Sequence, residues 1–147
     1  MDDHEVLKML FEEHHRQLAA ARLKIHTTAE RTLALLTIIA GWLVISDKPL
    51  IGGLQWILIV AITLITFGAC SIIYRNNSKY YKVAKVMPKI NTALGLFEPN
   101  KFYPNEAIYP ESWKTFGEKG KFWGVFTHYI MIIAVAILCI IASILKA

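Results

Sequence analysis

The sequence has few cysteines: only Cys70 and Cys139 among its 147 residues. Each cysteine lies in its own apolar run, toward the C-terminal end of that run, so antiparallel neighbouring helices would hold the two thiols at different depths. At a rise of about 1.5 Å per residue the mismatch is on the order of 15 Å, which is beyond disulfide reach. We therefore expect two reduced cysteines that pack inside helices, and no covalent cross-link.

Two long runs lack any charged residue: Gly53–Tyr74 and Trp123–Leu145. Each run is long enough to cross a hydrocarbon core of roughly 30 Å as a helix. A third apolar run, Thr32–Ser46, is shorter, but its helix can extend upstream through residues 27–31 to approach a spanning length. The charged, helix-forming residues that precede it argue against a signal peptide. The sequence predicts three transmembrane helices, and two remain the alternative.

Motifs that carry chemistry are also lacking. The chain has no nucleophile elbow, phosphate-binding glycine loop, paired intramembrane carboxylate or zinc spacing. We therefore predict a protein that is not an enzyme, with no catalytic residue, no cofactor and no metal site.

The adjacent His14 and His15 point about 100° apart on a helix and do not readily share an ion. His128, one turn into the last run, is expected to be an interfacial anchor rather than a proton relay, because the spans contain no Asp or Glu to exchange a proton with it.

The basic residues are distributed unevenly along the chain. Of the 16 Lys and Arg, five precede the first run, nine lie between Arg75 and Lys121, and the short first loop and the C-terminus carry one each. The positive-inside rule then places the N-terminus and the long second loop in the cytoplasm. The net charge of +5 is thereby an orientation signal, and we expect no nucleic-acid partner.

Together these patterns predict an all-α integral membrane protein with three transmembrane helices, a cytoplasmic N-terminal helix, and a cytoplasmic helix-plus-loop layer between spans two and three. The expected segments are an amphipathic helix at 1–29, the first span with an outer turn at 30–51, the second span at 53–75, the cytoplasmic layer at 76–121, and the third span at 122–146.

Within the layer, Pro88 is expected to break or kink a helix. Gly95 is expected to weaken the last turn of the next helix and Pro99 to end it, with no regular element from Glu98 to Gly120.

The N-terminal helix carries a heptad seam, in which apolar and small residues alternate at spacings of four and three. Its members are Leu7, Phe11, His14, Leu18, Ala21 and Ile25. Two interpretations are open. The seam packs on the cytoplasmic helices of its own chain or on the membrane, or it joins copies of the chain in a helical bundle.

Small and mildly polar residues lie within the predicted spans. The candidates for a pore lining or for close helix packing are Thr37, Gly41, Thr63, Thr66, Cys70 and Ser143. Small side chains let helices approach closely in lipid, and hydroxyls on one face can also line a narrow pore in an oligomer. Both uses require association of helices, so we expect a homo-oligomer.

The loop between the second and third spans is unusually aromatic. It includes the sequence EPNKFYPNEAIYPESW, residues 98–113, which is too apolar for a disordered linker. The candidate residues for a cytoplasmic surface are Phe97, Tyr103, Tyr109 and Trp113. We expect their rings to fold back against the neighbouring helices as a compact cap. The alternative is that they stay exposed and dock a cytoplasmic protein.

The order of elements over roughly residues 5–97, a charged helix, two close spans and a basic helix, resembles the SLATT-type effector domains of bacterial conflict systems. That resemblance implies a non-enzymatic oligomeric effector or channel-like protein, which would perturb the bacterial inner membrane in antiviral defence. Its partners would be the lipid bilayer and further copies of the chain. The alternatives are a membrane-anchored accessory subunit with a cytoplasmic protein partner, and a phage holin-like protein.

Overall fold

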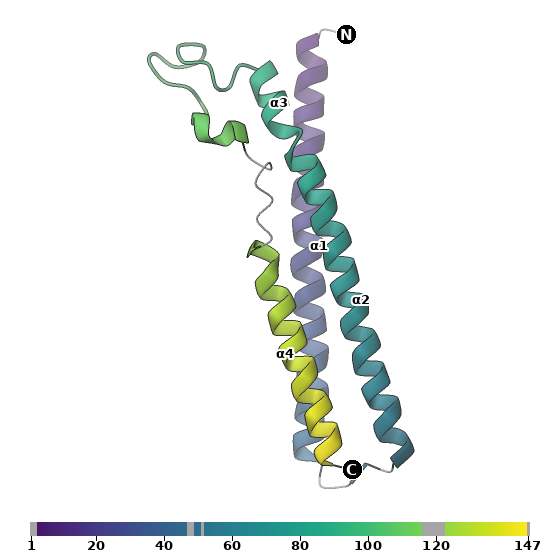
Figure 1. Ribbon diagram of the computed structural model, residues 1–147. Helices are drawn as coiled ribbons and strands as arrows, with labels where there is room; N and C mark the ends of the chain where they lie inside the picture. The colour runs from purple at the N-terminus through teal and green to yellow at the C-terminus, as the bar shows by residue number, and fades with distance from the viewer. Residues whose placement is uncertain (1–2, 47–48, 51, 116–122, 147) are drawn as a thin grey trace. The chain divides into compact units, whose positions relative to one another are not determined.

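The chain forms four α-helices and one short 3-10 helix in the computed structural model, which describes residues 3–46, 49–50, 52–115 and 123–146 (Figure 1). The elements are α1 (Asp3–Ile45), α2 (Gly52–Ala84), α3 (Met87–Ala93), η1 (Glu111–Thr115) and α4 (Trp123–Leu145). The described residues contain no strand, and an isolated bridge joins Tyr103 and Glu106. Parts of four predicted segments lie outside the described residues: the start of the N-terminal helix at 1–2, the outer turn at 47–48 and 51, the end of the layer at 116–121, and the start of the third span at 122.

Three helices are long and apolar enough to cross a membrane: Glu5–Ile45, Gly53–Ala93 and Val125–Leu145. The prediction of an all-helical chain with three candidate spans, rather than two, is confirmed as far as helix length and composition are concerned. The first candidate is longer than expected, because the predicted N-terminal helix and first span are one continuous helix, α1. The absence of Gly and Pro from residues 3–40 explains this continuity.

The chain divides into two compact units. One, here called the three-helix unit, comprises residues 24–75 and 122–147. The other, here called the loop unit, comprises residues 1–23 and 76–121. Both α1 and α2 contribute to each unit.

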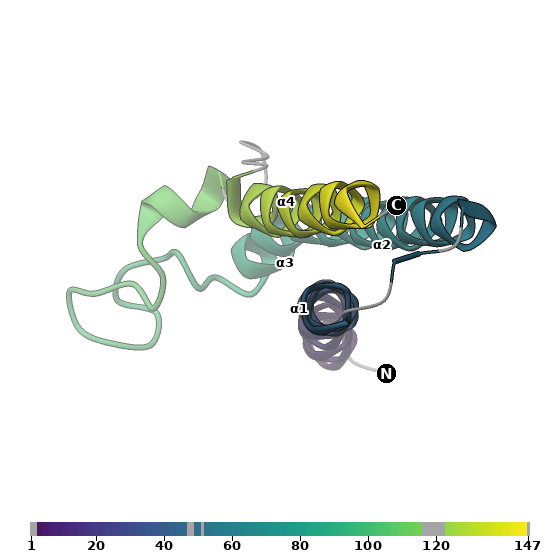
Figure 2. The same ribbon diagram turned by 90° about the horizontal axis from the view of Figure 1, so that it is seen from below.

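The core of the three-helix unit is made by one apolar face from each of α1, α2 and α4; Figure 2 shows α1 nearly end-on, with α4 and α2 overlapping in the view. The buried residues of this core are Ile25, Ala29, Leu36, Ile62, Ile73, Val125, Ile132, Ala136 and Cys139. Each helix therefore buries a narrow stripe. The opposite faces carry exposed large apolar residues such as Trp42, Phe67 and Leu138.

Two hydrogen bonds join distant parts of the chain within the three-helix unit. The Cys139 thiol donates to the Leu36 carbonyl at 3.3 Å, which links α4 to α1. At the end where α1 and α2 are connected, the Leu50 N–H donates to the Lys146 carbonyl at 2.9 Å. Both cysteines are free, as predicted.

In the loop unit, the chain turns between α2 and α3 at Lys85 and Val86, and Pro88 occupies the first turn of α3. A proline is tolerated there because the first N–H groups of a helix have no intrahelical partner. The helix break predicted from Pro88 is thus confirmed. Met87 and Ile90 direct α3 into the interior of the unit, where both are buried.

The end of α3 differs from the prediction. The helix stops at Ala93, and Gly95 adopts a left-handed φ of 73° just beyond it. The Leu96 N–H donates to the Asn91 carbonyl at 3.0 Å, and the Gly95 N–H donates to the Thr92 carbonyl at 2.9 Å. This pair of bonds is a Schellman motif. Gly95, rather than Pro99, therefore terminates the helix.

The expectation of no regular element after Glu98 is wrong at Glu111–Thr115, where η1 forms. Pro110 precedes this helix, and its carbonyl accepts a 3.0 Å hydrogen bond from the Trp113 N–H. Upstream, Asn100 and Asn105 have positive φ values of 66° and 64°. Asn tolerates this conformation, and the Asn105 N–H donates to the Asn100 side chain at 2.7 Å.

Candidate functional site

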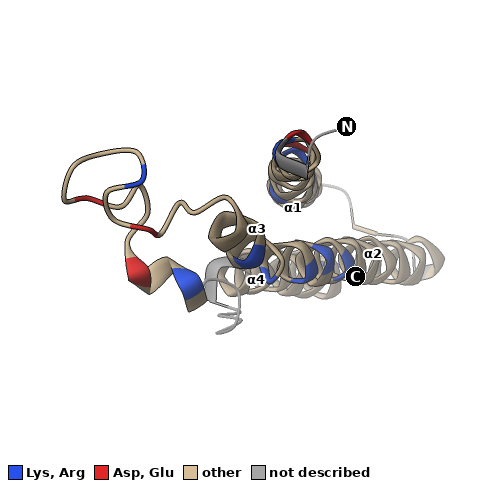
Figure 3. Ribbon diagram, turned by 90° about the horizontal axis from the view of Figure 1, so that it is seen from above, with Lys and Arg blue, Asp and Glu red and all other residues tan. Residues whose placement is uncertain are grey.

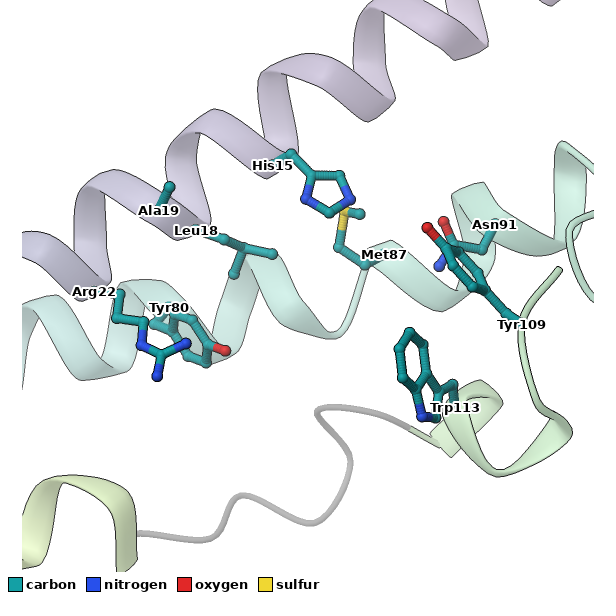
Figure 4. Close-up of a pocket in the computed structure, with 9 residues that line it drawn as sticks. All are labelled: His15, Leu18, Ala19, Arg22, Tyr80, Met87, Asn91, Tyr109 and Trp113. Atoms are coloured by element: carbon teal, nitrogen blue, oxygen red, sulfur yellow. The ribbon is translucent and has the colours of Figure 1, made fainter.

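A groove of about 520 Å³ lies within the loop unit, bounded by α1, by α2 and α3, and by the segment that enters η1 (Figure 4). We call it the loop-unit groove. It is lined by His15, Leu18, Ala19, Arg22, Tyr80, Met87, Asn91, Tyr109 and Trp113. The volume falls within the range of roughly 300 to 1,000 Å³ that is typical of small-molecule sites. The groove combines aromatic walls with a few polar groups.

Helix α1 supplies one wall through residues spaced three and four apart, which places them on one face. Leu18 and Ala19 form its apolar middle, and His15 and Arg22 lie on either side of them. The His15 ring packs edge-on against Phe11, with 4.4 Å between ring centroids. Arg22 is exposed and makes no ion pair with the residues that the structure describes. This wall therefore presents an available cation at one end.

Helices α2 and α3 supply the opposite wall through Tyr80, Met87 and Asn91. Met87 is buried, and Asn91 is only 8% exposed. The Asn91 side-chain oxygen is enclosed and has no hydrogen-bond partner in the described part of the chain. Since a buried amide oxygen without a partner costs roughly 1 to 3 kcal/mol, Asn91 is the least satisfied group of the groove.

The third wall is aromatic and is held by the fold of the loop. The Tyr109 N–H donates to the Leu96 carbonyl at 3.0 Å, which ties the loop to the end of α3. Ring centroids are separated by 6.1 Å between Phe97 and Tyr109 and by 5.2 Å between Tyr109 and Trp113. Phe97 anchors this row in the interior, and Trp113 carries it to the surface.

Charged residues around the aromatic row are paired at the surface. Lys114 donates to Glu111 at 2.9 Å, and its amine also lies 5.6 Å from the centre of the Phe97 ring. The hydrogen bond and the positive charge of Lys114 lower the pKa of the Glu111 carboxyl. On α1, Glu13 accepts hydrogen bonds from Gln17 and Arg16, which likewise lower its pKa. These short-range pairs stabilise local helix and leave Arg22 of the groove uninvolved.

The four predicted loop residues fall into two groups. Phe97 is 6% exposed and Tyr109 is half-buried, whereas Tyr103 is 61% exposed and Trp113 is 52% exposed. The compact cap expected from the sequence therefore forms around Phe97 and does not include Tyr103. Tyr103 lies in the turn between Asn100 and Asn105, which is closed by the hydrogen bond from the Asn105 N–H to the Asn100 side chain and by the bridge between Tyr103 and Glu106.

The predicted heptad seam is in contact with its own chain. Leu18 faces Tyr80 and Met87 across the loop-unit groove, and Ile25 is buried in the core of the three-helix unit. The remaining seam residues, Leu7, Phe11, His14 and Ala21, are half-buried. His14 donates to the carbonyl of Leu10 at 2.8 Å on its own helix. These contacts favour intramolecular packing over a bundle of several chains.

The six candidate pore or packing residues do not share one surface of the three-helix unit. Thr37 and Thr63 are exposed, Ser143 is buried, and Gly41, Thr66 and Cys70 are half-buried. The Thr63 hydroxyl donates to the Ile59 carbonyl and the Ser143 hydroxyl to the Cys139 carbonyl, both at 2.8 Å. The described residues of one chain therefore do not line a pore with this set.

A histidine pair between α1 and α4 escaped the sequence reasoning. His128 Nε2 lies 3.2 Å from His26 Nδ1, and the ring centroids are 4.9 Å apart. His128 thus bonds across the helix interface instead of serving only as an interfacial anchor. No group of three or more His, Cys, Asp or Glu in the described residues is arranged to hold a metal ion.

Comparisons of the chain with protein-family models, curated proteins and solved structures give no match. The resemblance to SLATT-type effectors accordingly rests on the order of its elements. The structure itself supports a helical protein with three candidate membrane spans.

Proposed function

We propose that this chain is a non-enzymatic, homo-oligomeric membrane protein that acts as an effector or channel-like module in the bacterial inner membrane. The observation that carries the proposal is the open space around the glycines of the candidate spans. A Cβ atom added to Gly41 or to Gly68 would have no neighbour within 4 Å. Helix association through these positions would give the three-helix unit its activity.

Membrane insertion is supported by the surface of the three-helix unit. Large apolar side chains such as Trp56, Leu64 and Ile137 are at least half exposed. In water, so much contiguous apolar surface would drive aggregation, whereas lipid chains cover it without penalty. The unit is therefore suited to the bilayer.

Self-association is supported by Gly41 and Gly68 together with Thr37. A glycine inside a helix costs roughly 1 kcal/mol relative to alanine, yet the described packing of the chain does not need either glycine. Thr37 and Gly41 are four residues apart on α1, the small-xxx-small spacing that lets membrane helices approach closely. A second copy of the chain would use the space that they leave.

The proposed orientation has the N-terminus in the cytoplasm. Lys79, Lys82, Lys85 and Lys89 are all exposed in the loop unit, where Figure 3 shows basic residues (blue) along α2 and α3. These lysines make no ion pair with other described residues. They are available for the anionic headgroups and water of the cytoplasmic side.

Inducible expression in bacteria tests this proposal, with a membrane-potential dye and a viability count as readouts. We expect the wild-type chain to depolarise the membrane and lower viability, and to migrate as a multimer in mild detergent. Gly41→Leu should weaken all three effects, because its side chain fills the space that the second helix would occupy. A Cβ at this position has no neighbour within 4 Å in the described chain, so we expect the fold to persist, and circular dichroism checks this.

Val44→Leu is the matched control, since Val44 lies on the same helix and is 75% exposed. It should behave like the wild type in all three measurements. A wild-type protein that is monomeric and leaves the membrane potential unchanged would overturn the proposal.

The exposure of Tyr103 and Trp113 favours a second candidate function, an accessory subunit that docks a cytoplasmic protein through the loop. Exposed aromatic residues are frequent anchors of protein interfaces. This function predicts an abundant protein with no effect on membrane potential. It also predicts that Tyr103→Ser and Trp113→Ser together abolish co-purification of one specific protein, which the wild type retains.

A further inference from the structure

We propose that the loop-unit groove binds a small planar aromatic anion that carries an N–H donor. The ring would lie at the end of the groove formed by Asn91, Tyr109 and Trp113, and the anionic group at the end formed by Arg22. This inference concerns the loop unit alone and does not depend on the membrane activity proposed above.

The N–H donor is inferred from Asn91. Its side-chain oxygen is enclosed without a hydrogen-bond partner among the described residues, and the residue is more than nine-tenths buried. Figure 4 shows the Asn91 amide and the Tyr109 ring both directed into the space bounded by His15, Met87 and Trp113. A ligand N–H that reaches this oxygen would satisfy the least satisfied polar atom of the groove.

The planar ring is inferred from the aromatic wall. Tyr109 and Trp113 pack against each other with a 35° angle between their planes, so they present a continuous aromatic surface at that end. Trp113 is 52% exposed, which leaves part of its indole free to stack. Met87 adds a polarisable floor that adapts to flat ligands. An aliphatic ligand would not use this geometry.

The anionic group is inferred from the opposite end. Arg22 lies seven residues after His15 on α1, which corresponds to roughly 10 Å along the helix. Arg22 is exposed, has no ion pair among the described residues, and lines the groove together with Tyr80. Guanidinium groups bind carboxylates and phosphates in a bidentate manner. A ligand with its ring and its anion about 10 Å apart, or slightly less, would contact both ends.

Titration calorimetry on the full chain in lipid nanodiscs tests the proposal, with empty nanodiscs as the blank. The probes are 5′-AMP, an aromatic phosphate with an exocyclic amine, and indole-3-butyrate, an aromatic carboxylate with a ring N–H whose three-methylene chain lets the carboxylate extend toward Arg22. Saturable binding of either probe supports the site. Preference for the first identifies a phosphate as the anionic group, and preference for the second identifies a carboxylate.

Two variants and a control assign the binding to the groove. Asn91→Leu and Arg22→Gln should each weaken the affinity by roughly tenfold or more, with unchanged helical content by circular dichroism. Arg16→Gln, the same change at an exposed α1 position outside the groove lining, should leave affinity unchanged. The absence of saturable binding of both probes would overturn the proposal. Equal loss in Arg16→Gln, or equal binding of benzoate, which lacks an N–H, would overturn it as well.

Discussion

At the scale of single residues, the backbone of Gly95 decides where α3 ends and how the aromatic loop begins. Its positive φ permits the two hydrogen bonds of the Schellman motif, and the chain then reaches Phe97, which is buried. The side chain of Lys101 crosses the face of Gly95 that a Cβ would occupy. A non-glycine residue at this position must therefore both adopt an unfavourable conformation and displace Lys101.

We predict that Gly95→Ala destabilises the loop unit by about 1 to 2 kcal/mol, the cost of the left-handed conformation for a residue with a Cβ. Lys101 is flexible and should move aside at little further cost. Chemical denaturation in detergent, followed by Trp fluorescence, measures the change. Gly53→Ala, at a position without positive φ and with open space around it, should be neutral or stabilising. Equal effects of the two substitutions would contradict the role assigned to Gly95.

At the scale of elements, α1 and α4 are held together by apolar packing and by polar contacts between side chains far apart in sequence. The His26–His128 pair and the Cys139–Leu36 hydrogen bond lie at different levels of this interface. One imidazole must donate and the other accept, which fixes the rotation of the two helices. Polar pairs of this kind specify helix register in a core of interchangeable aliphatic residues.

We predict that His26→Phe and His128→Phe each destabilise the three-helix unit by about 1 kcal/mol, because each removes the same hydrogen bond. The double variant should be no less stable than the worse single variant, since the bond is lost only once. Unfolding in mixed detergent micelles, followed by circular dichroism, gives the three free energies. Strictly additive losses would show that the two rings do not interact.

At the scale of the whole molecule, the distribution of charge follows the division into two units. Eight of the nine basic residues of the second loop belong to the loop unit, whereas residues 53–74 and 123–145 in the three-helix unit carry no charge at all. A helix such as α2 passes from the uncharged segment into one with Arg75, Lys79 and Lys82. This pattern is typical of a helix that leaves a membrane on its cytoplasmic side.

We predict that a cysteine placed at Pro49 is labelled by an impermeant thiol reagent added outside intact cells, and that one at Lys114 is not. Both positions are exposed, so accessibility of the site itself does not limit the reaction. Cys70 and Cys139 are replaced by alanine in the background. Lys114→Cys should react once the cells are permeabilised, which controls for folding. Labelling of both positions in intact cells would exclude the proposed topology.

Features that depend on local composition could be predicted from the sequence alone. Uncharged apolar runs specify the candidate spans, Pro88 specifies the break between α2 and α3, and the separation of Cys70 from Cys139 excludes a disulfide. Each depends on neighbouring residues or on helical rise alone. Leu18, Tyr109 and Trp113 of the groove were identified from sequence for the same reason, since they are apolar or aromatic residues in polar surroundings.

Which distant residues meet could not be predicted from the sequence, because it depends on how the helices pack. Arg22, Tyr80 and Asn91 are unremarkable helix residues in sequence, where a polar side chain on a helix normally indicates a solvated face. The fold of the loop unit gathers them around one groove and encloses the Asn91 amide without a partner. Likewise, His26 and His128 are 102 residues apart and meet only because α1 and α4 pack side by side. Such pairings depend on helix rotation and register, which the packing of buried side chains sets over long range.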